Sequence, residues 1–283
     1  MNKKVGFDYA LDWMTNETVL AALSVVKQGK VYDLGNTMSR DMPMGSRDTF
    51  DSFRISQYRL PAGLVGLDTT GFDFAMDTIS CSPHLGTHID CFSHVQNGGK
   101  TFQGEKTTDL ISRYGWKKFT SESVPPIFLR GVLIDLPKFL GVDIVPDDML
   151  IDEKMLAEAV EALGVEIRTG DAVLVRTGKQ AEFLAGDENY FNRQCGVIGT
   201  GSKWLYEQGM ALLGSDTSAT DPTPMVQGND THTAMMVERG VHLIEIMDLD
   251  ALARDGVKEF CFIGLPLKIK GTTGAWIRPV ALA

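Results

Sequence analysis

Apolar residues in the second half of the chain follow two spacings, one typical of buried strands and one typical of amphipathic helices. Apolar runs of strand length predict buried strands at residues 127–134, 171–177, 210–216, 241–246 and 259–267. Apolar residues at helical intervals predict helices at residues 151–163, 201–208 and 231–239. Because strands and helices alternate along this half, we expect crossover connections and an α/β fold.

The first half of the chain is less regular. Residues 9–27 carry apolar side chains at helical spacing, and capping residues at 15–18 leave two short helices as an alternative. A short strand is expected at 31–34. Residues 35–75 show few periodic signals, so we expect a long loop there. Loops of this length are uncommon and often functional, which favours a segment that covers the substrate or contacts another subunit.

Two more elements are expected before the chain becomes regular. Residues 74–80 alternate between apolar and polar side chains, which predicts a strand, and residues 107–114 have a helical pattern. No repeat, low-complexity tract or interdomain linker interrupts the 283 residues. We therefore predict a single domain, residues 1–283, in which residues 1–30 form a helical N-terminal extension.

Composition narrows the range of partners. The formal net charge of −10, without a basic stripe, argues against nucleic acid and anionic membranes. The chain has no run of 18 apolar residues and no signal-peptide pattern, so we predict a cytoplasmic protein without a transmembrane helix. Its four cysteines form no CxxC pair, which favours buried free thiols, although Cys91 is close enough to several histidines in the sequence to be a metal ligand.

Three of the five histidines fall within eleven residues, together with an aspartate: His84, His88, Asp90 and His94. Imidazole nitrogens and carboxylate oxygens are common ligands of zinc and similar divalent ions. In an extended strand His84 and His88 would be roughly 13 Å apart. The backbone must therefore bend between them, and Gly86 tolerates the angles of a bulge or tight turn. The segment is suited to placing His84, His88 and Asp90 around one ion.

His94 has two possible roles at such a site. It follows Asp90 by four residues, so it could be a fourth ligand, or it could stand beside an open coordination position and move protons. A catalytic metal site needs an open position and a nearby base. We favour His94 as the general acid/base.

The stretch from His84 to His94 resembles the HxGTHxDxPxH motif of the putative cyclase family, which includes bacterial kynurenine formamidase and isatin hydrolase. Phe92 stands where the motif has proline. Residues 232–236, 241–245, 214–222 and 266–274 resemble further segments of the family, so the resemblance covers roughly residues 30–283. It implies a single α/β domain with a mixed sheet of the swivelling β/β/α type and flanking helices.

The resemblance also implies a ligand set. His84, His88 and Asp90 would bind the first metal, and Asp90 would bridge to a second ion held by His232 and Glu245. From the residues alone, His232 is equally a helix N-terminal residue. Glu245 lies in an apolar strand pattern, where a buried carboxylate is costly unless it is paired or coordinated, which favours a functional role. His242 has the opposite strand parity to Glu245, so we interpret it as a packing or surface histidine.

We therefore predict a metal-dependent hydrolase that cleaves an amide bond in a kynurenine formamidase-like reaction, with metal-activated water, His94 as general acid/base and Glu245 as a further catalytic group. A cyclic amide or lactone hydrolase of the isatin hydrolase type is the alternative, followed by a cyclase or dehydratase and by a non-catalytic metal binder. The metal is Zn²⁺ or Mn²⁺, which share these ligands. The resemblance implies an aromatic amide substrate and a homodimer or homotetramer.

Overall fold

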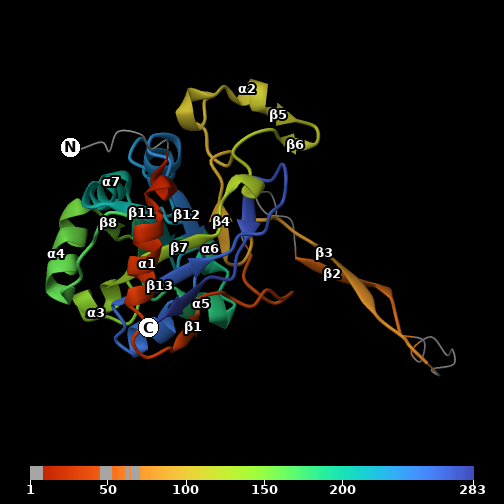
Figure 1. Ribbon diagram of the computed structural model, residues 1–283, viewed down its shortest axis with the longest axis horizontal. Helices are drawn as coiled ribbons and strands as arrows, with labels where there is room; N and C mark the ends of the chain where they lie inside the picture. Colours follow the sequence, from red (N-terminus) through yellow and green to blue (C-terminus); the bar gives the residue numbers. More distant parts are fainter. Residues whose placement is uncertain (1–8, 45–52, 62–63, 65–70) are drawn as a thin grey trace.

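The computed structural model describes residues 9–44, 53–61, 64 and 71–283, and a nine-stranded sheet forms the centre of this described part (Figure 1). Its strands, in spatial order, are β1 (Val31–Asp33), β15 (Val280–Leu282), β13 (Glu259–Gly264), β7 (Ile127–Asp135), β9 (Asp171–Arg176), β11 (Met210–Ser215), β12 (His242–Glu245), β4 (His88–Asp90) and β14 (Gly274–Trp276).

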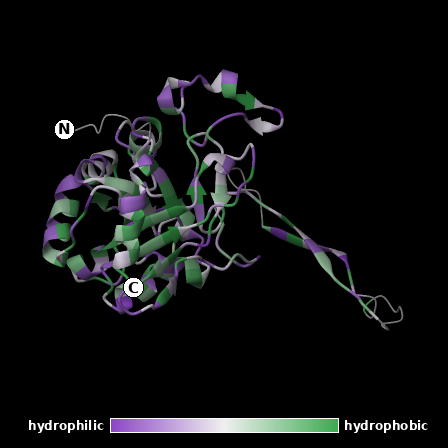
Figure 2. Cartoon of the chain, viewed as in Figure 1, coloured by the Kyte–Doolittle hydropathy of each residue, from purple (hydrophilic) through white to green (hydrophobic). Residues whose placement is uncertain are grey.

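The sheet mixes parallel and antiparallel pairs, as expected for the predicted α/β fold. The four neighbours β7, β9, β11 and β12 run parallel to one another. On one side β13, β15 and β1 add antiparallel pairs, and on the other side β4 and β14 do the same. Parallel strands are usually covered on both faces, and β9 and β11 are buried almost throughout. Figure 2 shows these central strands as hydrophobic and the outer side of the neighbouring helix α4 as hydrophilic.

Short helices surround the sheet. In chain order they are η1 (Ala10–Trp13), α1 (Asn16–Ser24), η3 (Phe102–Gly104), α2 (Thr107–Leu110), η4 (Ser121–Ser123), α3 (Leu136–Leu140), α4 (Glu153–Leu163), α5 (Gln180–Ala185), α6 (Asn189–Asn192), α7 (Gly199–Gln208), η5 (Thr233–Val237) and α8 (Asp250–Arg254). Helix α1 packs against β7 and β13, whereas α4 packs against β7 and α7. No helix in the described part of the chain is long and apolar enough to cross a membrane. The cytoplasmic location stays a prediction.

The N-terminal region forms two short helices rather than one. Helix η1 ends at Trp13, and Thr15 caps the start of α1, because its hydroxyl accepts a hydrogen bond from the backbone N–H of Thr18 at 3.3 Å. The Thr18 hydroxyl in turn accepts from the N–H of Thr15 at 2.8 Å. This reciprocal cap satisfies N–H groups that a helix start leaves without partners, and it confirms the two-helix alternative.

The prediction of a structureless loop at residues 35–75 is wrong in part. Strand β2 (Arg54–Arg59) pairs with β3 (Met76–Ser80) in an antiparallel hairpin that projects from the body of the molecule (Figure 1). The predicted strand at 74–80 is therefore present, but it pairs with β2 and does not join the central sheet. Parts of the expected loop, residues 45–52, 62–63 and 65–70, lie outside the described residues.

Two predicted helices take a different form. The helix expected at 107–114 ends at Leu110, and β5 (Ile111–Ser112) and β6 (Gly115–Trp116) follow as a small hairpin. Its turn lies against the backbone of Gly271: a Cβ on Gly115 would be 2.5 Å from the Gly271 carbonyl oxygen, and the Trp116 N–H donates to that oxygen at 3.0 Å. This contact with a distant segment favours the hairpin over a continued helix.

The helix expected at 231–239 is a short π-helix, Thr233–Val237, in which the N–H of Glu238 reaches the carbonyl of Thr233 five residues earlier. Smaller differences concern element ends. Helix α4 begins at Glu153, because Asp152 caps it and residues 150–151 form β8, which pairs with β10 (Gly196–Val197). The strand expected at 259–267 stops at Gly264, and two strands that were not predicted, β14 and β15, follow it.

We predict that Gly131→Ala lowers the free energy of unfolding by about 1–3 kcal/mol, because it overpacks the sheet. Gly131 lies opposite Phe260, and a Cβ there would be 2.2 Å from the Phe260 ring. Chemical denaturation measures the effect. Because Phe260→Leu removes the ring, the double variant should lose less stability than the sum of the two single variants. Additive losses would show that the contact with the Phe260 ring is not what destabilises Gly131→Ala.

Candidate metal centre

The predicted histidine cluster lies on β4, which is hydrogen-bonded between β12 and β14. His88 and Asp90 are two residues apart, so their side chains share one face of the sheet. Glu245 stands directly opposite His88 in the antiparallel pair β12–β4, and directly opposite residues share a face. The register of these two strands therefore brings together residues that are more than 150 positions apart.

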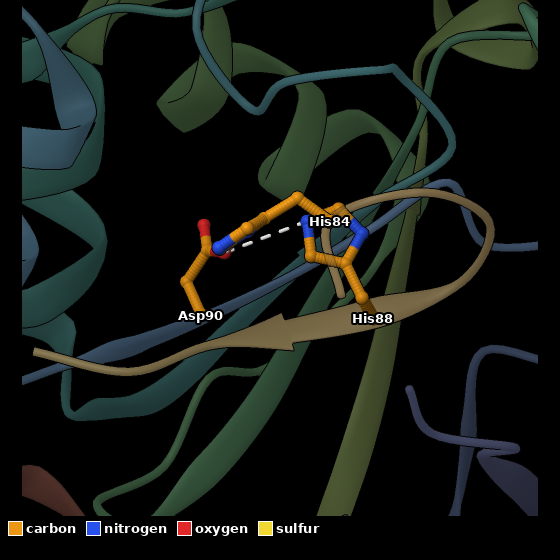
Figure 3. Close-up of side chains that lie close together, drawn as sticks. All are labelled: His84, His88 and Asp90. Carbon is orange, nitrogen blue, oxygen red and sulfur yellow. Dashed lines mark ion pairs between the residues drawn. The ribbon is translucent and has the colours of Figure 1, made fainter. Parts of the chain in front are cut away.

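A turn before β4 adds His84 to this face. Gly86 bends the chain with φ 71°, and a Cβ at this position would be 2.9 Å from Met38 Cγ. The bend expected between the two histidines is present. As a result His84 Nδ1 lies 2.8 Å from Asp90 Oδ1, and His88 Nε2 lies 3.4 Å from the same oxygen (Figure 3).

His232 approaches the other oxygen of Asp90. Its Nε2 lies 3.6 Å from Asp90 Oδ2 and 3.5 Å from Glu245 Oε1, while Glu245 Oε2 lies 3.5 Å from His88 Nε2. Glu245 is held in place by Thr220, whose N–H and hydroxyl donate to Oε1 at 2.7 and 3.1 Å. Oδ1 of Asp90 thus faces His84 and His88, and Oδ2 faces His232.

The atoms that face one another in this cluster are not hydrogen-bonded. Both oxygens of Asp90 and Nδ1 of His84 are buried without a hydrogen-bond partner. A buried carboxylate without partners is costly, and a divalent cation is the usual remedy. Two groups of candidate ligands have their ligand atoms within 4.8 Å of one another: His84, His88 and Asp90, and Asp90, His94 and His232. The donor set and the unpaired atoms therefore fit a divalent metal ion.

The electrostatics agree with a cation-binding site. Burial raises the pKa of Glu245, and the nearby charge of Asp90 raises it further, to about 7. Burial also opposes ionisation of Asp90, but His94, His232 and His84 outweigh it and hold the pKa of Asp90 well below its usual value. Burial lowers the pKa of His232, yet the nearby carboxylates of Asp221 and Asp90 raise it well above the usual value. Two buried carboxylates facing each other require positive charge between them.

His94 is the one histidine of the five that is not buried. Its ring stacks on His84 with 4.0 Å between ring centroids and lies 6.1 Å from the ring of His232. Desolvation and, to a smaller extent, the neighbouring histidines lower the pKa of His94. The charge of Asp90 raises it in part, and the net value is about 4. A neutral ring at the open side of the cluster can accept a proton. Its place beside Asp90 and His232 also keeps the ligand alternative open.

His242 packs beneath the site instead of taking part in the cluster. It is buried, its Nδ1–H donates to the backbone carbonyl of Asp90 at 2.7 Å, and its ring stacks on Phe92 with 4.0 Å between centroids. Phe92, which occupies the proline position of the motif, therefore packs against His242. Cys91 is buried but belongs to neither group of candidate ligands among the described residues, and none of the four cysteines forms a disulfide.

Several residues that shape the site were not singled out from the sequence as site residues. Asp221, Thr220 and Thr273 each contact a candidate ligand through a side-chain oxygen. All three fall in segments that resemble the family, 214–222 and 266–274, but the resemblance assigned none of them a role. Threonines in loops carry no pattern that reveals such contacts.

Ile246, directly after Glu245, has a strained backbone. Its φ of 55° is in the left-handed region, where a β-branched residue is rare. Three hydrogen bonds hold it: its N–H donates to Thr217 O at 3.0 Å, and its carbonyl accepts from the Thr87 hydroxyl at 2.6 Å and the Asn36 amide at 2.8 Å. Thr87 of the histidine motif therefore connects the turn before β4 to the end of β12.

The profile of the family described as "Putative cyclase" matches residues 32–222. The chain belongs to this family. Among curated proteins, it is 23% identical over 257 residues to a kynurenine formamidase from Bacillus thuringiensis subsp. konkukian (strain 97-27), covering 90% of this chain and 98% of that protein. A kynurenine formamidase from Bacillus cereus matches with the same identity and coverage.

Solved structures share the fold across nearly the whole chain. A crystal structure described as a novel cyclase superposes with a TM-score of 0.87 at 24% identity, covering 98% of this chain and 94% of the other. An isatin hydrolase bound to the product analogue thioisatinate superposes with a TM-score of 0.68 at 21% identity, covering 95% and 99%. These similarities confirm the predicted mixed α/β fold.

We predict that Thr87→Val lowers the free energy of unfolding by about 1–3 kcal/mol, because the Ile246 carbonyl and the Asn36 N–H lose a buried partner. Thermal and chemical denaturation measure this loss. Thr87→Ser keeps the hydroxyl and is the matched control, so it should retain most of the stability. Thr87→Val keeps a methyl group and loses the hydroxyl, whereas Thr87→Ser loses the methyl group, so equal losses in the two variants would contradict a dominant role of the hydrogen bonds.

Proposed function

We propose that the cluster binds divalent ions, with His84, His88 and Asp90 on one side and His232 and Glu245 on the other, and Asp90 shared between them. The observation that supports this most directly is the Asp90 carboxylate, buried with both oxygens unpaired among imidazoles. The identity of the ion, Zn²⁺ or Mn²⁺, stays a prediction, because both metals accept these ligands.

The activity that this arrangement favours is hydrolysis of an amide bond by a metal-dependent enzyme. Family membership and the curated kynurenine formamidases, which align over 90% of the chain, support an aryl formamide as substrate. Opening of a cyclic amide is the second candidate. The structural likeness to an isatin hydrolase, which covers 95% of the chain, favours it.

A bound divalent ion would polarise the carbonyl group of the substrate and acidify a water molecule. His94 is placed to act as the general acid/base, because its neutral ring lies beside the cluster and is more exposed than the other histidines. It accepts a proton from the attacking water and returns it to the leaving nitrogen, so that amide and water become carboxylic acid and amine. Glu245, held by Thr220, balances the positive charge opposite Asp90.

We predict that His94→Ala lowers kcat by about 10²–10⁴-fold, because the acid/base group is lost, while the content of bound metal stays close to that of the wild type. Elemental analysis and steady-state kinetics on one preparation measure both. Removal of metal with a chelator should abolish activity in the wild type, and added Zn²⁺ or Mn²⁺ should restore it. Loss of metal from His94→Ala would instead make His94 a ligand.

N-formyl-L-kynurenine and isatin distinguish the two candidate reactions. We expect the metal-loaded protein to hydrolyse N-formyl-L-kynurenine with the higher kcat/KM, as followed by absorbance. A higher kcat/KM for isatin would favour cyclic amide opening. Turnover of neither substrate with either metal would reject both candidates.

We further propose that two copies of the chain form a homodimer through the β2–β3 hairpin. A two-stranded hairpin is marginally stable alone in water, and this one exposes large apolar side chains, among them Tyr58, Phe72, Phe74, Met76 and Ile79. Phe72 is 92% exposed. A second copy that covers these side chains would account for their exposure in a single chain.

The double variant Phe72→Ser/Ile79→Ser should shift the sedimentation of the protein towards the monomer, because it removes apolar area from the proposed interface. Tyr114→Ser is the matched control, since Tyr114 is also exposed, at 79%, but lies on the separate β5–β6 hairpin. Analytical ultracentrifugation over a range of concentrations measures the effect. A wild-type protein that sediments as a single chain, or a double variant that stays dimeric, would contradict the proposed interface.

A further inference from the structure

The three candidate ligand histidines differ in what holds the ring nitrogen that points away from the cluster. For His84 the partner is a threonine hydroxyl, and for His88 it is a backbone carbonyl. For His232 it is a carboxylate: Nδ1 lies 2.6 Å from Oδ2 of Asp221. Among these three candidate ligands, His232 is the one whose outer nitrogen meets a negative charge.

Asp221 is itself held in one orientation. It is fully buried, and both of its oxygens accept hydrogen bonds. Oδ1 accepts from the backbone N–H of Thr231 at 2.7 Å, and Oδ2 accepts from the backbone N–H of His232 at 3.0 Å as well as from its ring. Three donors from two consecutive residues therefore fix both oxygens, and the ring of His232 has little freedom to turn away.

This arrangement determines which nitrogen of His232 faces the cluster without a proton. Both oxygens of Asp221 accept hydrogen bonds from backbone N–H groups, so Nδ1 is the donor to Asp221, and in the neutral ring that binds a metal the lone pair lies on Nε2. Nε2 is the atom that lies 3.6 Å from Asp90 Oδ2 and 3.5 Å from Glu245 Oε1. The ring therefore presents an electron pair to the space between the two carboxylates.

We propose that Asp221 is a positioning residue that holds His232 with Nε2 unprotonated towards Asp90 and Glu245 and strengthens it as a metal ligand. Carboxylate partners of this kind fix the tautomer of a ligating histidine and raise its basicity. The inference rests on the proposed metal site, and it makes His232 depend on Asp221 in a way that His84 and His88 do not share.

Asp221→Asn tests the proposal, because the new amide must direct a donor at either the Thr231 N–H or the His232 ring. The affinity of the purified protein for Zn²⁺, measured by competition with a chromophoric chelator, should fall by about 10–100-fold. Circular dichroism and thermal denaturation of the same samples report whether the variant folds.

Asp216→Asn is the matched control. Asp216 is also fully buried and directly follows β11. It accepts three hydrogen bonds, from the N–H and hydroxyl of Thr177 and the N–H of Gly178. It should lose stability without a comparable loss of Zn²⁺ affinity. Equal losses of affinity in the two variants would overturn the proposal and leave Asp221 a structural residue.

A measurement on the unaltered protein keeps the proposal testable if Asp221→Asn does not fold. Zinc is diamagnetic, and the chain has only five histidines, so ¹⁵N-labelled imidazoles can be resolved by NMR in the zinc-loaded protein. The His232 ring should show a hydrogen on Nδ1 that exchanges slowly with solvent and none on Nε2. A hydrogen on Nε2, or a rapidly exchanging Nδ1–H, would overturn the proposal.

These outcomes separate the inference from the proposed function. A wild-type protein that binds neither Zn²⁺ nor Mn²⁺ would contradict the metal site and with it the inference. If the wild type binds Zn²⁺ and the Asp221→Asn variant binds it equally tightly, the result would contradict the role of Asp221 and leave the metal site standing.

Discussion

The carboxylate of Asp90 is the group on which the rest of the site depends. It is completely buried, lies within 3.6 Å of imidazole nitrogens from three histidines, and accepts no hydrogen bond on either oxygen. Leaving a carboxylate in this condition costs several kcal/mol unless positive charge compensates it. A cation between these atoms would supply that charge, and the same cation would give the surrounding imidazoles a common partner.

The fold stabilises this concentration of charged groups with rigid supports. Strand β4 lies between β12 and β14, and its pairing with β12 aligns His88, Asp90 and Glu245. The strained turn at Ile246 ends β12, and the Thr87 hydroxyl holds its carbonyl. Strain of this kind persists only when the surrounding structure holds it, and it is common near functional sites. Here it connects the two chain segments that carry most of the cluster.

Local sequence was sufficient for the first part of the site and insufficient for the second. His84, His88 and Asp90 are close in the chain, and the bend between them needs only Gly86, so spacing and residue type predict their convergence. His232 and Glu245 join them through the order of strands in the sheet, which spacing does not reveal. Their inclusion came from the family resemblance.

The elements that the sequence predicted incorrectly depend on distant contacts. The β5–β6 turn lies against Gly271, more than 150 residues away, and β2 lies within the residues expected to be a loop and pairs with β3 further along the chain. The central strands β7, β9, β11, β12 and β13 were predicted well, because their burial gives them continuous apolar runs, whereas the short strands β8, β10, β14 and β15 were not predicted. Asp221 and Thr220 act through single side-chain contacts, and such contacts leave no periodic pattern in a sequence.

Anomalous X-ray scattering from crystals of the zinc- or manganese-loaded protein tests the metal site most directly. Data collected on both sides of the absorption edge of the metal locate the ion independently of the protein atoms. The account predicts an anomalous peak between the Asp90 carboxylate and the ring nitrogens of His84 and His88, within bonding distance of each. Metal-loaded crystals without a peak at Asp90, or with the ion bound elsewhere, would contradict it.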